Sequence, residues 1–561
     1  MTDLVLHPGL VLIVGALALS GLTGRLRAAA VVVLPLVGLA LVGLVPDGPA
    51  WQVHYLDHTL TPLQGDRLSR LFATIFALMA AAGGLFALGQ RSRVEVPAAY
   101  VYAGSAIGVA LAGDLITLFV FWEMMAVASA TVLWSQGGAD AYRAARRYLS
   151  IHLLGGVLLL AGIGGHVAQT GDVAFGRLLL DSPAHWLILA GFLVNAGAPP
   201  LSAWLPDAYP EASWSGTVFL SAFTTKAAVY ALIRGFPGTE LLVWVGLFMV
   251  FYGIVYALLE NDMRRILAYS IVNQVGFMLA GIGIGTEMAI NGAAAHAFAH
   301  ILYKALLLMS AGSVLLMTGR RKCSELGGLF HTMPLTTVCG TIGALAISSF
   351  PLTSGFVSKS MVSQAAADDH LLTVWLLLTA ASAGVFLHAG IKFPWFVFFQ
   401  KDSGLRPSEP PQSMRWAMIV LAFMCIAIGV WPAPLYAMLP YAVNYVPYTW
   451  AHVLTQLQLL LFSGLAFFVM LPWLKRTLTI TLDTDWLWRV ALPALAARAG
   501  RLGAAAIAPP RRALVGLGRA LRPAVHGLLG ERGRLAVAAP TRSMALWVLV
   551  LLLGYLLLYY A

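Results

Sequence analysis

The chain has 561 residues, of which 60% are hydrophobic and 11% charged, with a formal net charge of +11. A soluble domain has about 45–50% apolar and about 25% charged residues. This composition excludes a disordered chain, a disulfide scaffold and a secreted enzyme, and it indicates an integral membrane protein. The three cysteines, Cys323, Cys339 and Cys425, form no Cys-x-x-Cys pair. We therefore expect no iron–sulfur cluster, zinc site or redox dithiol built by this chain alone.

Hydropathy predicts about sixteen membrane-spanning segments, because a spanning helix needs about 20 mainly apolar residues. The candidates lie near residues 7–23, 28–45, 68–89, 97–113, 115–135, 146–167, 185–204, 216–234, 240–259, 266–285, 288–317, 333–355, 373–399, 415–437, 452–474 and 543–560. No basic region precedes the first candidate, and Asp3 is its only early charge. We expect that segment to be a span rather than a cleaved signal peptide.

Basic residues are concentrated in alternate loops between these spans. They are Arg25, Arg27, Arg91, Arg93, Arg143, Arg146, Arg147, Arg264, Arg265, Arg320, Arg321, Lys322, Lys401, Arg406 and Arg415. Because cytoplasmic loops are enriched in basic residues, we expect these loops in the cytoplasm and both termini on the outer, periplasmic side. The loop at 205–215 gives the weakest signal, since its only charges are Asp207 and Glu211.

Ionisable residues occur inside several predicted spans, where each buried charge costs about 2.5–3.5 kcal/mol on insertion scales. They are Glu123, Lys226, His296, His300, Lys304, Lys359, His388 and Lys392. The spacing i, i+4, i+8 of His296, His300 and Lys304 predicts one helical face. Polar residues that only hold helices together are the alternative. We favour a proton relay, with Lys392 as an additional member.

Two spans are expected to break within the membrane, because each contains prolines that cannot continue a helix. The first break is NAGAPPLSAWLPDAYP at 195–210 and the second is ISSFPLTSGFVSK at 347–359. They fall in the seventh and twelfth spans, which predicts two inverted repeats of five helices, as in many ion transporters. The expected fold is an all-α polytopic membrane protein with about sixteen transmembrane helices and two broken helices. The expected regions are N-terminal helices at 1–95, repeats at 96–235 and 236–400, C-terminal helices at 401–480, and a basic segment with a final anchor at 481–561.

The segment 486–540 alternates apolar residues with arginine and contains several prolines. The wider stretch from Arg489 to Arg542 has ten arginines and a single acid, Glu531. This pattern predicts interfacial amphipathic helix pieces that lead to a last membrane anchor at 543–560. A loosely ordered cytoplasmic loop is the alternative.

Six motifs lie between residues 70 and 440. They are GDLITLFVFWEMM at 113–125, WLPDAYPEA at 204–212, FTTKAAVYALIR at 223–234, NDMRRILAYSIVNQVGFM at 261–278, HAFAHILYKALL at 296–307 and FPLTSGFVSK at 350–359. Together they resemble the antiporter-like subunit family, which is shared by Mrp-type multisubunit cation/proton antiporters, respiratory complex I and membrane-bound hydrogenases. The resemblance implies a proton relay through Glu123, Lys226, His296, His300, Lys304 and Lys359.

Two positions depart from the pattern of that family. The family usually has a lysine nine residues before the Trp of WLPDA, and this lysine pairs with the glutamate; here the position is Asn195. Either Lys226 pairs with Glu123 instead, or the first half of the relay works differently. Gln274 stands where some members have histidine.

The resemblance implies a proton-translocating subunit of an Mrp-type Na⁺/proton antiporter, most similar to the D-type subunit, in a bacterial inner membrane. It would be a secondary-transporter subunit rather than an enzyme, with other membrane subunits as partners and with no cofactor or nucleic acid. A proton-pumping subunit of a complex I-type NADH:quinone oxidoreductase or membrane-bound hydrogenase is the alternative, and a passive channel or scaffold subunit is the third. The sequence leaves the coupled cation and any metal site open.

Overall fold

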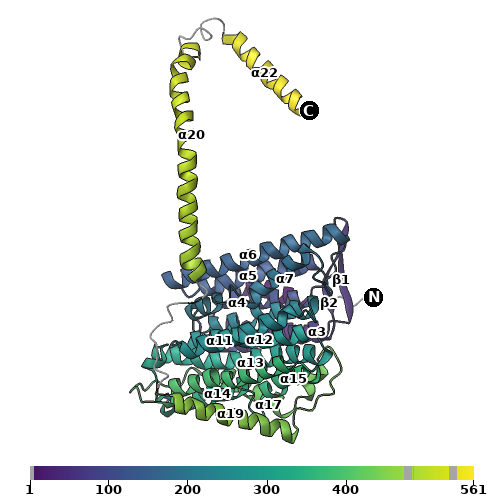
Figure 1. Cartoon of the computed structure of the whole chain (residues 1–561), viewed down its shortest axis with the longest axis vertical. Helices are drawn as coiled ribbons and strands as arrows, with labels where there is room; N and C mark the ends of the chain where they lie inside the picture. Colours follow the sequence, from purple (N-terminus) through teal and green to yellow (C-terminus); the bar gives the residue numbers. More distant parts are fainter. Residues whose placement is uncertain (1–4, 473–482, 484–485, 530–539, 561) are drawn as a thin grey trace. The chain divides into compact units, whose positions relative to one another are not determined.

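The computed structural model describes residues 5–472, 483, 486–529 and 540–560. The chain divides into two compact units, Met1–Thr484 and Asp485–Ala561. In the first unit the helices lie side by side, and their facing apolar surfaces form one continuous core (Figure 1).

The N-terminal part of the first unit carries a small hairpin among its helices. Its elements are α1 (Pro8–Leu19), α2 (Gly24–Gly43), β1 (Gly48–Tyr55), β2 (His58–Gly65), α3 (Arg67–Phe86), η1 (Ala87–Gly89), α4 (Glu95–Leu111), α5 (Leu115–Trp134), α6 (Ala139–Thr170), α7 (Pro183–Ala196), α8 (Trp204–Ala208), η2 (Tyr209–Glu211), α9 (Gly216–Ala222) and α10 (Thr224–Gly235).

The rest of the first unit is helical, with short irregular turns at the helix ends. Its elements are α11 (Leu241–Leu259), α12 (Met263–Ile284), α13 (Glu287–Thr318), η3 (Cys323–Glu325), η4 (Leu329–His331), α14 (Pro334–Ile347), α15 (Ser354–Asp368), α16 (Leu372–Val385), η5 (Phe386–Lys392), η6 (Trp395–Phe399), α17 (Gln412–Val430), α18 (Ala433–Ala437) and α19 (Trp450–Met470).

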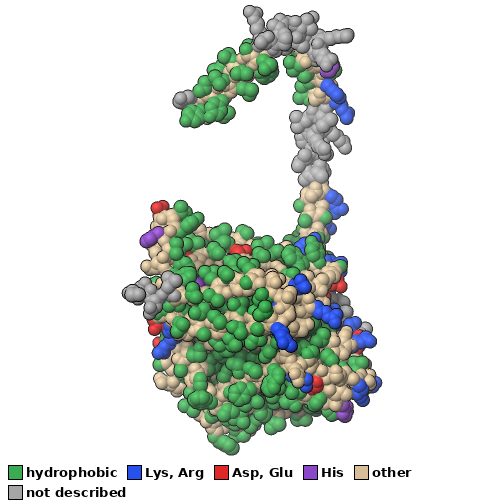
Figure 2. Space-filling model, turned by 180° about the vertical axis from the view of Figure 1, so that it is seen from behind, with side chains coloured by type: hydrophobic (Ala, Val, Ile, Leu, Met, Phe, Trp, Pro, Cys, Tyr) green, Lys and Arg blue, Asp and Glu red, His purple; other side chains and the backbone are tan. Residues whose placement is uncertain are grey.

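Eleven helices of the described residues are long and apolar enough to cross a membrane. Other predicted spans correspond to the shorter apolar helices Pro8–Leu19, Glu95–Leu111, Pro183–Ala196, Pro334–Ile347 and Met544–Tyr559. On the face seen in Figure 2, apolar side chains cover the middle of the first unit, and Lys and Arg gather mainly along one edge. A helical polytopic membrane protein is therefore confirmed, whereas the number of sixteen crossings stays a prediction.

The segment between α2 and α3 forms a β-hairpin, where hydropathy predicts only a loop. β1 and β2 pair antiparallel, with Val53 opposite Leu60. Thr61 in β2 donates its backbone N–H to Asp114 Oδ2 at 2.7 Å, and Asp114 also caps the first turn of α5. The hairpin thus fixes the end of the helix that carries Glu123.

Both predicted breaks are present in the structure. α7 ends at Ala196, Gly197 adopts a left-handed conformation, and helix resumes only at Trp204. Trp204 Nε1 donates to the carbonyl oxygen of Val194 at 3.0 Å, which ties the resumed helix to the end of α7. The second break separates α14 from α15 between Ile347 and Ser354. The assignment of two inverted repeats stays a prediction.

The weakly charged loop after α7 contacts the basic loops through its acidic residues. Asp207 forms an ion pair with Arg147 at 2.7 Å, and Glu211 forms one with Arg321 at 3.1 Å. The loop therefore lies on the same edge of the first unit as these two arginines. The loop thus supplies acidic partners for arginines of neighbouring loops. It has no basic residue of its own, so the charge pattern did not assign it clearly to one side.

The second unit contains η7 (Leu487–Ala491), α20 (Leu492–Leu529) and α22 (Pro540–Tyr560). The prediction of several helix pieces is wrong for α20, which runs continuously past Pro509 and Pro523. Its many Ala, Leu and Arg residues have high helix propensity. Their contribution offsets the cost of the hydrogen bonds that the prolines cannot donate. α22 covers the predicted anchor and begins at a proline, which is favoured at a first helical position.

Candidate functional site

α13 carries three ionisable side chains on one buried face. His296, His300 and Lys304 are each 0% exposed, and the ring centroids of the two histidines are 6.3 Å apart. Lys304 Nζ donates to Ser270 Oγ of α12 at 2.9 Å. The four-residue spacing therefore arranges a row of proton-binding groups along one side of the helix.

His296 joins α13 to the two neighbouring helices, α12 and α15. Its Nε2 donates to Gln274 Oε1 at 3.1 Å, and its Nδ1 lies 3.3 Å from Ser358 Oγ. Tyr303 also donates to Gln274 Oε1, at 3.2 Å. Gln274, which replaces the histidine of some relatives, thus accepts two hydrogen bonds in this network. Neither ring nitrogen of His300 has a hydrogen-bond partner among the described residues.

Lys226 lies at the start of α10, directly after the interruption that separates α10 from α9 at Phe223. It is 0% exposed. Its Nζ donates to the carbonyl oxygen of Ser221 at 2.8 Å and to Thr225 Oγ1 at 3.0 Å. Neither Lys226 nor Lys304 pairs with a carboxylate of the described residues.

Lys359 lies in α15, just after the second break, and it is 1% exposed. Its Nζ has no hydrogen-bond partner within the described part of the chain and lies 4.2 Å from the ring centroid of Phe277, a cation–π distance. It also lines a cavity of about 100 Å³ together with Gln364 and His452. The side chain of Lys359 therefore borders a small cavity with several polar lining residues, while its amine lies over the ring of Phe277.

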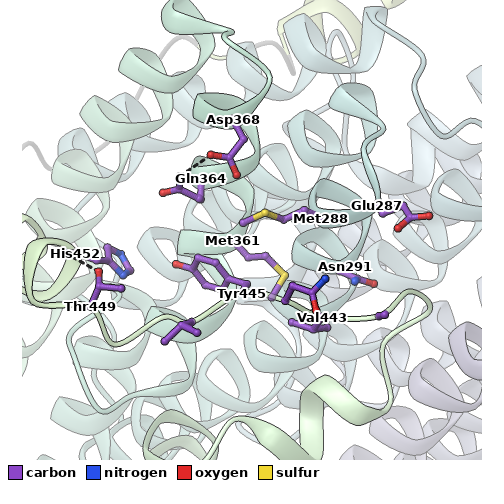
Figure 3. Close-up of a pocket in the computed structure, with 13 residues that line it drawn as sticks. Glu287, Met288, Asn291, Met361, Gln364, Asp368, Val443, Tyr445, Thr449 and His452 are labelled. Atoms are coloured by element: carbon purple, nitrogen blue, oxygen red, sulfur yellow. Dashed lines mark hydrogen bonds between the residues drawn. The ribbon is translucent and has the colours of Figure 1, made fainter.

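A larger cavity of about 690 Å³ adjoins this space (Figure 3). Gln364 and His452 line both cavities, and the larger one is also lined by Glu287 and Asp368. Gln364 Nε2 donates to Asp368 Oδ1 at 2.7 Å. The cavity beside Lys359 thus shares two lining residues with a larger cavity that two carboxylates also line.

Glu123 is partly exposed on α5 and lines a mainly apolar hollow of about 690 Å³ beside α1 and α4. Its Oε1 is buried and has no hydrogen-bond partner among the residues that the structure describes. A Cβ atom placed on Gly156 of α6 would lie only 2.0 Å from this oxygen. The carboxylate therefore occupies space that exists because residue 156 has no side chain.

Asn195 lies near the end of α7 and packs against Gly155 of α6, the residue next to Gly156. It is 0% exposed, and neither atom of its amide has a hydrogen-bond partner in the described part of the chain. Its Oδ1 would lie 3.4 Å from a Cβ atom placed on Gly155. Glu123 and Lys226 form no ion pair among the described residues, and which group acts as the partner of Glu123 stays a prediction.

Lys392 is bonded to the end of α11 rather than to the row on α13. Its Nζ donates to the carbonyl oxygens of Ala257, Leu258 and Glu260 at 3.0, 2.6 and 2.5 Å. These carbonyls belong to the unsatisfied groups at a helix C-terminus. The contacts are those of a helix cap, which supports a structural role for Lys392.

Sequence reasoning overlooked several polar residues that complete the site. Ser270, Tyr303 and Ser358 contact the row on α13, and Tyr148 and His152 lie on α6 near Glu123. The spacing of Tyr148 and His152 in the sequence could have indicated them. Tyr148, His152 and Gly156 recur every four residues and so share one face of a helix.

Comparison with known proteins assigns the chain to a family. Residues 112–385 match the family model described as NADH:quinone oxidoreductase/Mrp antiporter, TM. Over 367 residues the chain is 32% identical to NADH-quinone oxidoreductase subunit N of Desulforudis audaxviator, covering 60% of this chain and 73% of that protein. The chain belongs to the NADH:quinone oxidoreductase/Mrp antiporter family.

Other members of the NADH:quinone oxidoreductase/Mrp antiporter family are antiporter subunits. The chain is 32% identical to a probable K⁺/H⁺ antiporter subunit of the A/B type from Rhizobium meliloti over 64% of its own length, but it spans only 40% of that protein. It is 30% identical to the D-type subunit of the Na⁺/H⁺ antiporter of Alkalihalophilus pseudofirmus, covering 52% of this chain and 64% of that protein. A chain in the structure of the Mrp complex from a Dietzia species shares the fold, with a TM-score of 0.68, 22% identity, and coverage of 77% and 95%.

The region matched to the NADH:quinone oxidoreductase/Mrp antiporter family contains most of the candidate site. Glu123, Asn195, Lys226, the row on α13 and Lys359 all lie between residues 112 and 385. Lys392 lies beyond it, in keeping with its contacts to the end of α11.

Proposed function

We propose that this chain is the proton-translocating membrane subunit of a multisubunit monovalent cation/proton antiporter. The observation that carries the proposal is the set of three buried lysines, Lys226, Lys304 and Lys359. None of them pairs with a carboxylate of the described residues. An unpaired charge inside a membrane is costly and is retained where it serves a function.

Protons would pass between the lysines through histidines, hydroxyl groups and water. Lys304 holds the central place, because α13 packs against α10, which carries Lys226, and against α15, which carries Lys359. His296 already contacts α15 through Ser358, and water can bridge polar groups that lie too far apart for direct contact. The cavities beyond Lys359 supply a route to one surface of the membrane.

The setting of this transport follows from the charge pattern and from the relatives. The basic loops would face the cytoplasm of a bacterial inner membrane, and the acidic cavity beside Asp368 would open to the periplasm, as would both termini. Other membrane subunits would be the partners. Na⁺ is the proposed exchanged cation, by analogy with the related D-type subunit of a Na⁺/H⁺ antiporter.

The test is dissipation of a pH gradient by proteoliposomes that contain the assembled complex. We expect Lys304→Met to abolish proton movement, since the row on α13 has no second lysine. We expect His296→Ala only to slow it, because water can take the place of the imidazole between Gln274 and Ser358. Lys322→Met, a lysine on the basic edge outside the row, is the control and should transport normally. Wild-type transport by Lys304→Met would refute the proposed relay.

A second candidate is a proton-pumping membrane subunit of a redox enzyme whose electron carriers lie on other chains. The 32% identity to an NADH-quinone oxidoreductase subunit N supports it. Purification of the complex through a tag on this chain separates the two candidates. Co-purifying flavin or iron–sulfur proteins with quinone reductase activity would favour the second, whereas small membrane subunits alone would favour the antiporter.

A further inference from the structure

Three polar side chains with buried, unused hydrogen-bonding atoms lie at neighbouring turns of α6. Glu123 lies against Gly156 and Asn195 lies against Gly155. His152 lies one turn earlier on the same helix and is 1% exposed, and its Nε2 has no hydrogen-bond partner among the described residues. Residues three and four apart on a helix are neighbours, with Cβ atoms about 5–6 Å apart. His152 is therefore one turn from the two glycines that Glu123 and Asn195 contact.

The orientation of the His152 ring is fixed by its surroundings. Nδ1 lies 2.8 Å from the carbonyl oxygen of Tyr148, which can only accept, so Nδ1 is the donor. In the neutral ring Nε2 is then the acceptor, with its lone pair free. The ring stacks on Tyr148 at 3.9 Å between centroids and meets Trp204 edge-on at 4.6 Å. The free nitrogen is thus a rigidly placed, buried proton acceptor.

A chain of hydroxyl groups leads from Tyr148, on which the His152 ring stacks, toward Lys226. The hydroxyl of Tyr148 donates to Ser129 Oγ at 3.0 Å and lies 3.2 Å from Thr224 Oγ1. Thr224 is the first residue of α10, and the next residue, Thr225, accepts a hydrogen bond from Lys226 Nζ at 3.0 Å. Hydroxyl groups both donate and accept, so with water such a chain can pass protons.

We propose that His152 carries the proton between Glu123 and Lys226, in the place of the family lysine that Asn195 replaces. This rests on the proposed function of the chain as a proton-translocating subunit. In the first step the O–H bond of protonated Glu123 breaks and an N–H bond forms at Nε2, leaving a carboxylate and an imidazolium. In the second step that N–H bond breaks, and the proton passes through water and hydroxyl groups to the neutral amine of Lys226, which becomes an ammonium.

A packing role alone does not account for this arrangement. A buried polar atom without a hydrogen bond costs about 1–3 kcal/mol, and phenylalanine would fill the same space beside Tyr148 and Trp204 without that cost. The asparagine at 195 cannot bind and release a proton near neutral pH, so the first half of the relay needs another titratable group. His152 is a titratable residue with a free ring nitrogen on the helix that Glu123 contacts, and its ring stacks on Tyr148.

The experiment measures proton movement by proteoliposomes that hold the assembled complex. We expect His152→Phe, which keeps the aromatic contacts, to slow transport about a hundredfold, the lower end of the usual contribution of a positioned proton carrier. His152→Gln, which stays polar but carries no proton, should be as slow. His166→Phe, a histidine on the same helix that bonds to His185, is the matched control and should transport normally.

A double-mutant cycle tests whether His152 replaces the lysine. In an Asn195→Lys background, which restores the family residue, His152→Phe should cost little. An equal loss from His152→Phe in both backgrounds would overturn the proposal, and so would wild-type transport by both His152→Phe and His152→Gln. If instead the wild-type complex moves no protons, or Lys304→Met transports normally, the proposed function itself fails, so the two failures are distinguishable.

Discussion

At the scale of single residues, Glu123 illustrates how a small neighbour creates a functional position. Its carboxylate forms no ion pair with a described residue and lies where a side chain at position 156 would otherwise be. The glycine costs the helix about 1 kcal/mol relative to alanine, so its presence reflects a need for space rather than for helix stability. Because residue 156 has no side chain, the carboxylate of Glu123 packs against α6 while Glu123 also lines the apolar hollow.

We predict that Gly156→Ala impairs transport while the protein stays folded. The added Cβ would displace the end of a flexible side chain, and alanine favours the helix, so assembly and thermal stability should be unchanged or slightly improved. Proton movement in proteoliposomes should fall by about tenfold or more, as expected when a reacting group is misplaced by about 1 Å. Gly164→Ala is the matched control, since its Cβ would meet no described atom within 4 Å on the same helix. Equal rates for the two variants would contradict the importance of the position of Glu123.

The titratable residues of α13 could be predicted because their spacing repeats every four residues in an apolar segment. His152 could not, since a lone histidine among Leu and Gly residues is more often a satisfied core residue. Its importance depends on the free Nε2 and on its closeness to Asn195, and both come from the packing of α6 against α7. The cavity between Lys359 and the acidic opening is likewise formed by segments far apart in the sequence.

At the scale of elements, three buried lysines lie next to irregular backbone, whereas Lys304 lies within the regular helix α13. Lys226 follows the interruption at Phe223, Lys359 follows the broken α14–α15 pair, and Lys392 ends the π-helical turn η5. The two main breaks could be predicted from prolines, because a proline has no backbone N–H to donate within a helix and is visible in the sequence. The π-helical turn and the β-hairpin have no such sequence signal, since hydropathy measures burial and not hydrogen-bond pattern.

We predict that Lys392→Met destabilises the protein more than it slows the relay. Loss of the ammonium leaves three carbonyl oxygens at the end of α11 without their donor, at a cost of about 1–3 kcal/mol. Thermal unfolding in detergent should shift to lower temperature, while the transport rate per assembled complex stays close to that of the wild type. Lys401→Met, an exposed lysine on the basic edge, should leave both quantities unchanged. Abolished transport with unaltered stability would instead return Lys392 to the relay.

At the scale of the whole molecule, the two units differ in how far their apolar side chains are buried. The first unit contains the continuous apolar core, whereas the described side chains of α20 and α22 are almost all exposed. Asp483, close to the boundary, still belongs to the first unit, where Tyr252 donates to its Oδ1 at 2.6 Å. Exposed apolar helices of this kind fit a membrane or a partner protein.

We predict that removal of residues 486–561 leaves the first unit folded but weakens assembly with other subunits. The core and the bond from Tyr252 to Asp483 are retained, so thermal unfolding of the truncated chain in detergent should be nearly unchanged. Co-purification with other subunits should fall, because α20 and α22 would no longer offer their apolar surface. Normal assembly of the truncated chain would show that these helices serve only the lipid surface.

The packing of α13 against both α10 and α15 has an electrical consequence. In the proposed relay a proton passes from Lys226 on α10 to Lys304 on α13 and on to Lys359 on α15, which is a movement between packed helices. Carrying one unit charge through the whole membrane involves about 2.3 kcal/mol of work per 100 mV. For transfers between neighbouring packed helices we expect most of that work to fall on the steps of uptake and release, so that the membrane voltage would act mainly on the two ends of the proposed route.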